Sequence, residues 1–216
     1  MSIVTSMTAA PLPPLAVGMI VFDGFELLDV FGPLEMFGML REKVAITILA
    51  ERLGPVRSSA GPAVVAERTL AEPGRLDVLL VPGGMGTRRE VNNFAFLNSL
   101  RALAAATPHV ASICTGSALL ARTGLLDQRR ATTNKRSYQW ATSQGTAVHW
   151  VAAARWVEDG KYLTSSGVSA GMDMALGLIA HLFDRATAEG VARGAEYEWN
   201  SDRDRDPFAK LNGLTS

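Results

Sequence analysis

The sequence predicts a doubly wound α/β fold, in which helices cover both faces of a mostly parallel sheet. Three observations support this prediction. Strand-like runs alternate with helical patterns along the chain, these runs are continuously apolar, and 48% of the 216 residues are hydrophobic. The alternation indicates strand–helix–strand units, continuous apolar runs are typical of strands buried on both faces, and the hydrophobic content suffices for one large core.

The first half of the chain begins this alternation. In order, its patterns predict a strand at 15–23, a helix within 26–40, a strand at 43–51, a hairpin around 62–68, a strand within 75–84 and a helix at 92–106. Pro33 falls inside the first helical segment. We expect it to open the main part of that helix, because a proline in the first turn loses no hydrogen bond.

The second half repeats the pattern. It predicts a strand at 109–113, a short helix at 115–124, a strand at 130–133, a polar helix at 135–144, a hairpin at 154–166 that turns at Asp-Gly, a long apolar helix at 169–184 and an amphipathic helix at roughly 187–197. No internal repeat or linker divides these elements. We therefore expect a short disordered leader at 1–14 and a single domain over 15–216.

Charge and composition exclude several classes of partner. Lys plus Arg and Asp plus Glu each number 21, so the formal net charge is zero and nothing resembles the basic footprint that nucleic acid or an anionic membrane requires. No apolar stretch reaches the ~20 residues that cross a bilayer. The first fourteen residues lack the pattern of a signal peptide, and a lone cysteine fits a reducing compartment. We expect a cytoplasmic protein.

The only cysteine, Cys114, lies between the strand at 109–113 and a helical pattern that begins with Thr115, Gly116 and Ser117. This placement resembles a nucleophile elbow with cysteine in place of serine. Unpaired N–H groups at the start of the helix would favour the thiolate and lower the thiol pKa. The alternative is a buried structural cysteine, since free cysteine is among the most buried residue types.

A reactive thiol needs a partner for its proton, and Asp29 is the best placed candidate. It lies six residues beyond the first strand, at the sheet edge where Cys114 is expected. Burial and a neighbouring thiolate would raise the pKa of this carboxyl, so that it could hold and donate a proton. Glu26 and Glu35 are alternatives in the same segment, and Asp29 could equally be a helix N-cap.

The three histidines are weaker candidates for this role. His109 begins the strand that leads to Cys114 and therefore lies near the opposite end of the sheet. His181 lies within the long apolar helix, and His149 has no acidic residue at a spacing that would orient it. A Cys-His-acid triad is therefore only weakly supported.

Two glycines follow the third core strand, in VPGG at 81–84. Gly83 and Gly84 would let the backbone approach a ligand closely and present an N–H to an oxyanion, although glycine after a strand is also common in plain turns. The spacing does not match the dinucleotide-binding fingerprint, so we expect no nucleotide cofactor. Phe31, Met36 and Trp140 could line an apolar pocket or belong to the core.

Four stretches together resemble the ThiJ/PfpI superfamily, which has a flavodoxin-like, class I glutamine amidotransferase-like fold. They are LLDVFGPLEMF, LLVPGG, ASICTGSALLARTGLLDQRRATT and LTSSGVSAGMDMALGLI, within about residues 15–185. A cysteine followed by Thr-Gly, together with an aspartate before Gly-Pro, most resembles the isonitrile hydratase branch. The resemblance implies a homodimer that acts on a small molecule and carries neither metal nor cofactor.

The resemblance also implies residue roles. Cys114 would be the nucleophile, Asp29 the acid and base, and Thr115 the support of the thiolate, with an oxyanion contact from the amides of Gly83 and Gly84. The thiolate would attack the terminal carbon of an isonitrile, and water would release an N-substituted formamide from the thioimidate.

The chain departs from its relatives at two positions. Thr115 stands where relatives with protease, deglycase or amidase assignments often have histidine, which argues against a protease. Asn134 and Lys135 stand where many close relatives read His-Trp, which changes one predicted wall of the pocket.

Two other functions compete with the hydratase. One is a small-molecule-binding module like the domain that precedes DNA-binding helices in some AraC-type regulators. The chain ends about thirty residues after the long helix, without room for two helix-turn-helix units, which disfavours a regulator. The other is a stress or redox sensor in which the cysteine is oxidised.

Overall fold

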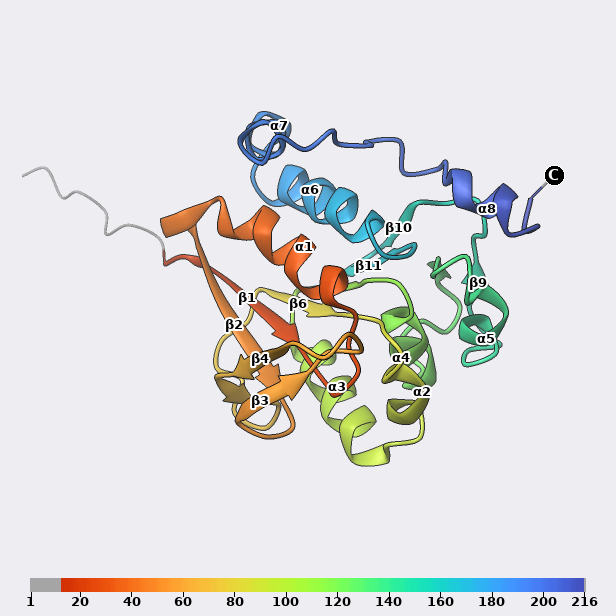
Figure 1. The fold of residues 1–216 in the computed structure, drawn as a ribbon, viewed down its shortest axis with the longest axis horizontal. Helices are drawn as coiled ribbons and strands as arrows, with labels where there is room; N and C mark the ends of the chain where they lie inside the picture. Colours follow the sequence, from red (N-terminus) through yellow and green to blue (C-terminus); the bar gives the residue numbers. More distant parts are fainter. Residues whose placement is uncertain (1–12, 216) are drawn as a thin grey trace, which may run out of the picture.

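The central feature of the computed structural model, which describes residues 13–215, is a seven-stranded sheet within that range. The strand order is β10-β11-β7-β6-β1-β2-β5 (Figure 1). The strands are β1 (Leu15–Ile20), β2 (Val44–Ala50), β5 (Arg68–Thr69), β6 (Val78–Val81), β7 (His109–Ser112), β10 (Trp156–Asp159) and β11 (Tyr162–Ser165). Every neighbouring pair is parallel except β10 with β11. The predicted mostly parallel sheet is confirmed.

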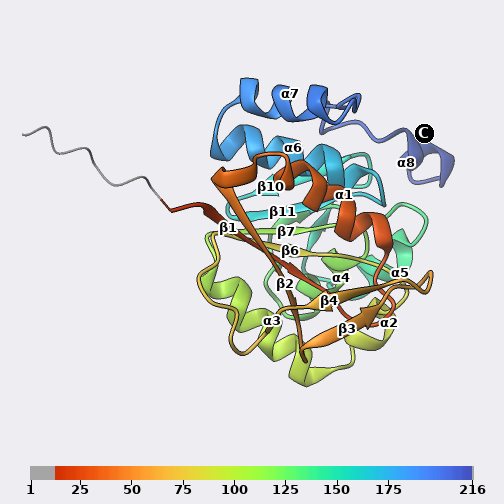
Figure 2. The ribbon, with the colours of Figure 1, turned by 60° about the vertical axis from the view of Figure 1, so that its left-hand side comes forward.

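Helices cover both faces of this sheet, as the alternation predicted (Figure 2). On one face lie α1 (Leu27–Gly38), α6 (Ala170–Leu182) and α7 (Arg185–Gly194), and on the other lie α2 (Thr87–Glu90), α3 (Phe94–Ala106) and α4 (Gly116–Arg122). The core lies between these layers and the central strands, and every residue of β6 is buried. This arrangement explains why the strand runs are apolar at successive positions.

Smaller elements complete the fold. An antiparallel hairpin joins β3 (Gly54–Arg57) to β4 (Ala63–Ala66), as predicted, and the Asp-Gly turn joins β10 to β11. The remaining elements are η1 (Arg41–Lys43), β8 (Arg130–Ala131), α5 (Tyr138–Thr142), β9 (His149–Trp150) and α8 (Pro207–Leu211). The predicted leader at 1–14 lies outside the described residues except for Pro13 and Pro14, which have no regular secondary structure.

Three details of the prediction were wrong. The strand predicted at 130–133 does not join the central sheet, because β8 pairs with β9 in a separate two-stranded sheet. The helix predicted at 135–144 is only the short α5. The short helices α2 and α8 were not predicted, since a single turn carries no periodic signal.

Pro33 was also misplaced, because it lies in the interior of α1 instead of opening its main part. Its missing N–H leaves the Asp29 carbonyl without the usual helical donor. Packing explains the tolerance, since Pro33 is buried where α1 crosses α6. A Cβ atom added at Gly171 of α6 would lie 3.3 Å from the Pro33 ring, so the two helices are in close contact there.

Candidate active site

Cys114 occupies a sharp turn between β7 and α4. Its φ is 56°, in the left-handed region that residues other than glycine rarely adopt, so the sharp turn expected from the resemblance to a nucleophile elbow is confirmed. The turn is held by its neighbours, because the Cys114 N–H donates to the Ser166 carbonyl at 3.2 Å. The hydroxyls of Ser117 and Thr133 both donate to the Cys114 carbonyl at 3.1 Å. The surrounding loops therefore fix the direction of the side chain.

Asp29 reaches the same site from the first turn of α1 and is completely buried. Its Oδ2 atom accepts the Gly83 N–H at 2.8 Å, and its Oδ1 atom has no hydrogen-bond partner among the described residues. The N-cap of α1 is Glu26, so the alternative interpretation of Asp29 as the cap is wrong. The carboxyl instead faces the cysteine closely enough that each group shifts the pKa of the other.

Burial raises the pKa of Asp29 from 3.8 to about 8, and the charge of Glu26 adds to this effect. The Gly83 N–H and the Cys114 side chain act in the opposite direction. Asp29 is therefore mostly protonated at neutral pH, as the sequence predicted. Protonation of the carboxyl also avoids the cost of an uncompensated buried charge on the Oδ1 atom.

The predicted lowering of the thiol pKa does not occur. Burial raises the pKa of Cys114, and the charge of Asp29 raises it further. The Thr115 N–H at the start of α4, the Asn134 side chain and the Thr115 hydroxyl all lower it, but they do not prevail. The helix terminus thus acts in the expected direction, and the cost of desolvating a thiolate is larger. At neutral pH both members of the Asp29–Cys114 pair hold a proton.

Asn134 contacts the reactive sulfur directly. Its Nδ2 atom donates to the Cys114 Sγ atom at 3.2 Å, while its Oδ1 atom accepts the Ser137 N–H at 2.8 Å. Because a backbone N–H can only donate, this second contact fixes the orientation of the amide. Sequence reasoning marked Asn134 as a departure from its relatives and placed it in the pocket wall, but it missed the contact with sulfur.

Gly83 and Gly84 hold the site residues in place. The Gly83 N–H is donated to Asp29, and the Gly84 N–H is donated to the Thr115 hydroxyl at 3.2 Å. A Cβ atom added at Gly83 would lie 2.6 Å from the Thr115 hydroxyl and 2.9 Å from the Asp29 carboxyl, so only glycine fits there. Both amides are therefore engaged within the protein, whereas the sequence suggested that they would face an oxyanion.

Arg88 brings a positive charge to the site that the sequence did not predict. Its guanidinium donates to the hydroxyls of Thr87 at 3.1 Å and Ser137 at 2.9 Å, and it lies 3.8 Å from the centre of the Trp140 ring. Burial lowers the pKa of Arg88, whereas negative charge on Cys114 raises it. The cation is thus placed where it would favour an anion on the sulfur. The sequence signal for this charge is the locally basic stretch TRRE at 87–90.

The other candidates lie away from the sulfur. His109 and His181 are neighbours in an edge-on contact, with ring centroids 5.7 Å apart, where β7 begins. His149 is exposed on β9. Glu35 lies nearly two turns beyond Asp29 on α1. Among the described residues no histidine contacts Cys114, so the site is a Cys-Asp pair rather than a Cys-His-acid triad.

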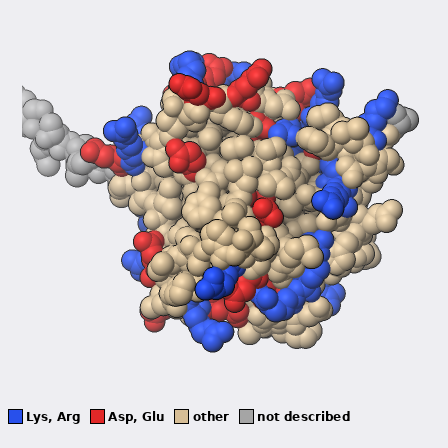
Figure 3. Space-filling model, viewed as in Figure 1, with Lys and Arg blue, Asp and Glu red and all other residues tan. Residues whose placement is uncertain are grey.

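The rest of the described chain adds two findings. No helix within residues 13–215 is long and apolar enough to span a membrane, and no group of three potential metal ligands occurs in that range. Acidic and basic residues are interspersed over the face shown in Figure 3.

The fold and the site define a class of protein, a flavodoxin-like α/β domain with a cysteine at the turn after a central strand. Residues 16–181 match the DJ-1/PfpI family. The chain therefore belongs to that family, and the resemblance to ThiJ/PfpI proteins is confirmed.

Curated proteins similar to this chain differ in function. The chain is 33% identical to the isonitrile hydratase of Pseudomonas putida, a match that covers 85% of this chain and 78% of that protein. It is also 27% identical to the HTH-type transcriptional regulator GbdR of Pseudomonas aeruginosa (strain UCBPP-PA14), with 93% of this chain but 56% of the regulator covered.

Solved structures show the same fold. A ThiJ/PfpI family protein from Pseudomonas syringae superposes with a TM-score of 0.80 at 30% identity, over 99% of this chain and 91% of that one. A DJ-1 superfamily protein from Salmonella typhimurium, solved as a cysteine-to-alanine mutant, gives a TM-score of 0.75 at 26% identity, over 86% of this chain and 100% of that one.

Proposed function

We propose that the protein hydrates isonitriles to N-substituted formamides through a covalent adduct on Cys114. One observation carries this proposal: the buried Asp29 carboxyl, whose pKa burial raises to about 8, faces a cysteine at a strained turn, with Asn134 at 3.2 Å from the sulfur. The isonitrile hydratase of Pseudomonas putida, 33% identical, supports the choice of reaction. The proposed substrate is a small molecule, and we propose that the active form is a cytoplasmic homodimer.

The pKa values of Asp29 and Cys114 are both raised, so both groups hold a proton at neutral pH. This suits the reaction, because the terminal carbon of an isonitrile must receive both a nucleophile and a proton. The Cys114 sulfur forms a bond to the terminal carbon, and Asp29 gives its proton to that carbon. Asp29 receives the thiol proton in exchange, so the pair starts and ends the step neutral. The product is a thioimidate, with one new S–C bond and one new C–H bond.

Water then resolves the adduct. It adds to the carbon of the C=N bond, the nitrogen takes up a proton, and the C–S bond breaks to release the formamide and return the thiol. Asp29 is the group placed to move protons in both halves of the cycle. The Asn134 amide and the Thr115 N–H face the sulfur and stabilise the negative charge that develops there.

Turnover of a simple isonitrile by wild type and Cys114→Ala tests the proposal. Wild type is expected to form the formamide, detected by proton NMR, with a transient increase in intact mass equal to one substrate. Cys114→Ala should lose at least ~10³-fold in rate while its circular dichroism spectrum is unchanged. Equal turnover by the two proteins would remove Cys114 from the mechanism.

The site gives less support to redox sensing. Sensor cysteines are exposed and have a low pKa, whereas Cys114 is 5% exposed and burial raises its pKa. Treatment with peroxide followed by intact-mass measurement separates the two functions. Rapid stoichiometric oxidation of Cys114, without turnover of any isonitrile, would favour the sensor.

A further inference from the structure

A basic cavity with a volume of about 460 Å³ lies beside α5. Its lining includes Arg88, Lys135 and Arg136, together with Ser137 and Trp140. No acidic residue of the described chain belongs to this lining. Because a concave surface lined by charges of one sign concentrates their field, this cavity attracts anions.

The three residues that could line an apolar pocket by sequence are separated in the structure. Trp140 lines the basic cavity instead. Met36 is buried in the hydrophobic core, and Phe31 is 46% exposed on α1. The charge of the cavity comes from α2 and from the residues just before α5, two segments that are distant in the sequence.

The two arginines of the cavity have no carboxylate partner within residues 13–215. Neither Arg88 nor Arg136 forms an ion pair there. Arg88 is half-buried, and its guanidinium donates to the neutral hydroxyls of Thr87 and Ser137 while it lies 3.8 Å from the centre of the Trp140 ring. A cation that is partly removed from water gains from an anion that binds beside it.

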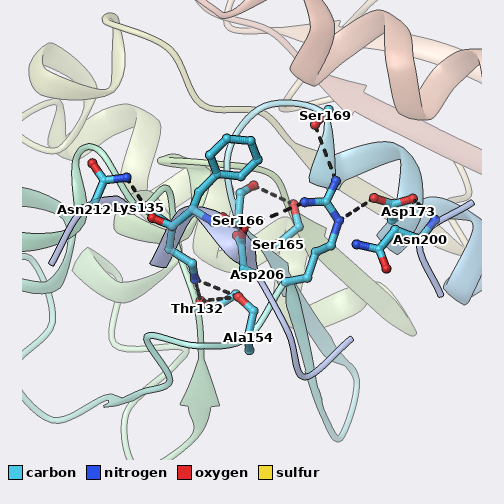
Figure 4. A network of polar contacts seen from close by, with 12 residues as sticks. Thr132, Lys135, Ala154, Ser165, Ser166, Ser169, Asp173, Asn200, Asp206 and Asn212 are labelled. Atoms are coloured by element: carbon cyan, nitrogen blue, oxygen red, sulfur yellow. Dashed lines mark hydrogen bonds and ion pairs between the residues drawn. The ribbon is translucent and has the colours of Figure 1, made fainter. Parts of the chain in front are cut away.

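Lys135 contributes charge to the lining but no free donor to a ligand. Its amine donates to the Thr132 hydroxyl and the Ala154 carbonyl, both at 2.7 Å (Figure 4). Burial lowers the pKa of Lys135 to about 8. The half-buried Arg88 and the exposed Arg136 therefore supply the permanent positive charge that an anion in the cavity would meet.

A chain of hydrogen bonds connects the Arg88 guanidinium to the reactive sulfur. The guanidinium donates to the Ser137 hydroxyl at 2.9 Å, and the Ser137 N–H donates to the Asn134 Oδ1 atom at 2.8 Å. The Nδ2 atom of the same amide donates to the Cys114 Sγ atom at 3.2 Å. Arg88 therefore contacts the cavity on one side and the residues that hold the sulfur on the other.

A second path runs through two threonine hydroxyls. The guanidinium donates to the Thr87 hydroxyl at 3.1 Å, which lies 3.2 Å from the Thr115 hydroxyl. The Thr115 hydroxyl in turn bonds to the Cys114 side chain and favours its ionised form. An anion that binds Arg88 from the cavity thus changes the charge that Cys114 faces.

We propose that this cavity binds a small oxyanion, a carboxylate or a phosphate, through Arg88 and Arg136, and that the bound anion slows reactions of Cys114. The anion neutralises the cation that favours negative charge on the sulfur, so the thiolate becomes harder to form. Linkage requires the converse as well, because ionised Cys114 must weaken binding of the anion by the same factor. This regulatory site goes beyond the proposed function and does not depend on which reaction Cys114 performs.

Binding is tested with inorganic phosphate and acetate as probes, and with sodium chloride at equal ionic strength as the control. Proton–nitrogen NMR follows the indole N–H of Trp140, assigned by its loss in Trp140→Phe. Phosphate, acetate or both should shift this signal saturably, and saturation by one alone identifies the chemical group. Arg88→Gln should weaken binding at least ~10-fold and Arg136→Gln about threefold. Arg101→Gln, which removes an exposed arginine of α3, should leave binding unchanged.

The effect on Cys114 is tested by alkylation with iodoacetamide. Cys114 is the only cysteine, so intact mass reports its modification without ambiguity. A saturating anion should slow the alkylation of wild type at least ~5-fold and move the profile of rate against pH to higher pH. Arg88→Gln should react slowly without any anion and lose the response to it, whereas Arg88→Lys should keep part of both.

Several outcomes would overturn the proposal. The site is rejected if chloride shifts the Trp140 signal as the oxyanions do, if the shift does not saturate, or if Arg101→Gln weakens binding like Arg88→Gln. The coupling is rejected if the bound anion leaves the alkylation of wild type unchanged, or if it slows alkylation equally at every pH, because the anion would then block the thiol directly. Neither measurement uses an isonitrile, so a failure of hydration does not affect them.

Discussion

Two buried aspartates, Asp29 and Asp173, occupy contrasting surroundings. Both are 0% exposed. Asp173 of α6 is saturated with donors, since it receives the Arg155 guanidinium at 2.5 Å, the Tyr197 hydroxyl at 2.9 Å and the Asn200 N–H at 3.0 Å. Figure 4 shows Asp173 beside Asn200. Asp29 receives one backbone N–H and has one oxygen without a partner among the described residues.

The difference separates a structural carboxylate from a reactive one. Burial raises the pKa of Asp173 above its ordinary value, although the charge of Arg155 and the hydrogen bonds from Arg155, Tyr197 and Asn200 lower it, so the ionised form is partly compensated. Nothing comparable compensates Asp29, whose pKa rises to about 8. A buried carboxyl that lacks donors keeps its proton available for exchange, and such groups are concentrated at functional sites.

The largest expected effect is on catalysis, when Asp29 is replaced by asparagine. Asp29→Asn keeps an oxygen that can accept the Gly83 N–H but cannot transfer a proton. The rate of isonitrile hydration should fall about 10²- to 10⁴-fold, the usual contribution of a positioned acid or base. Steady-state kinetics checks the rate, and thermal unfolding should show a protein at least as stable as wild type. A fully active Asp29→Asn would show that Asp29 is not the proton carrier.

The same substitution at Asp173 should have the opposite signature. Asp173→Asn leaves the buried Arg155 guanidinium with only its longer contact to the Asp206 carboxyl, at 3.9 Å, and breaking a buried pair costs about 3–5 kcal/mol in the free energy of unfolding. Urea denaturation measures the loss. Because Asp173 does not contact Cys114, the kcat of the molecules that remain folded should be close to wild type. A normal stability would mean that the donors around Asp173 contribute little.

Local patterns predicted much of this site, and the reasons are physical. Apolar runs and helical periods predicted the order of strands and helices. The geometry of a parallel sheet, whose strands all end at one edge, then predicted that Asp29 and Cys114 lie at that edge. The left-handed turn at Cys114 follows from the abrupt change from strand to helix. The elements and the turn depend on residues that are close together in the sequence, and the meeting of Asp29 with Cys114 follows from the general rule that parallel strands end at one edge.

Other features depend on contacts between distant segments, and patterns could not predict them. Asn134 reaches the sulfur from a loop twenty residues further along the chain, and Arg88 approaches from α2, a single helical turn. The sign of the pKa shift at Cys114 depends on how completely the site is desolvated. The helix terminus favoured a thiolate, and burial reversed the net effect.

The pH dependence of stability sharpens the contrast between the aspartates. Between pH 4 and pH 8 the folded protein keeps a proton on Asp29 that the unfolded chain has lost, so stability should fall as pH rises through this range. The expected loss is about 1–5 kcal/mol. Denaturation of wild type and Asp29→Asn at pH 5 and pH 8 measures it.

In that experiment the Asp29→Asn variant should lack the fall in the free energy of unfolding that Asp29 causes between pH 5 and pH 8. It should therefore be more stable than wild type at pH 8. Lys135 does not interfere, because its lowered pKa affects stability between about pH 8 and pH 10.5, where stability should rise with pH. Identical slopes for the two proteins would mean that Asp29 is ionised at neutral pH in the folded state.

The smallest expected effect concerns Asn134, whose amide donates to the sulfur but cannot titrate. Asn134→Ala removes one donor from the developing anion and should lower kcat/KM about tenfold. Asn134→Asp should lower it further, because a second carboxylate beside Cys114 opposes negative charge on sulfur. Asn92→Ala, an exposed asparagine in the loop after α2, is the matched control.

Asn134→His distinguishes a fixed donor from a general base. If Asn134 acts only as a hydrogen-bond donor, Asn134→His should not increase kcat/KM. The imidazole should then support activity only when its ring N–H points at the sulfur. If a base limits the rate, Asn134→His should increase kcat/KM between pH 6 and pH 8, where histidine becomes neutral. We expect the first result, because in the proposed mechanism Asp29 holds and returns the proton that Cys114 exchanges.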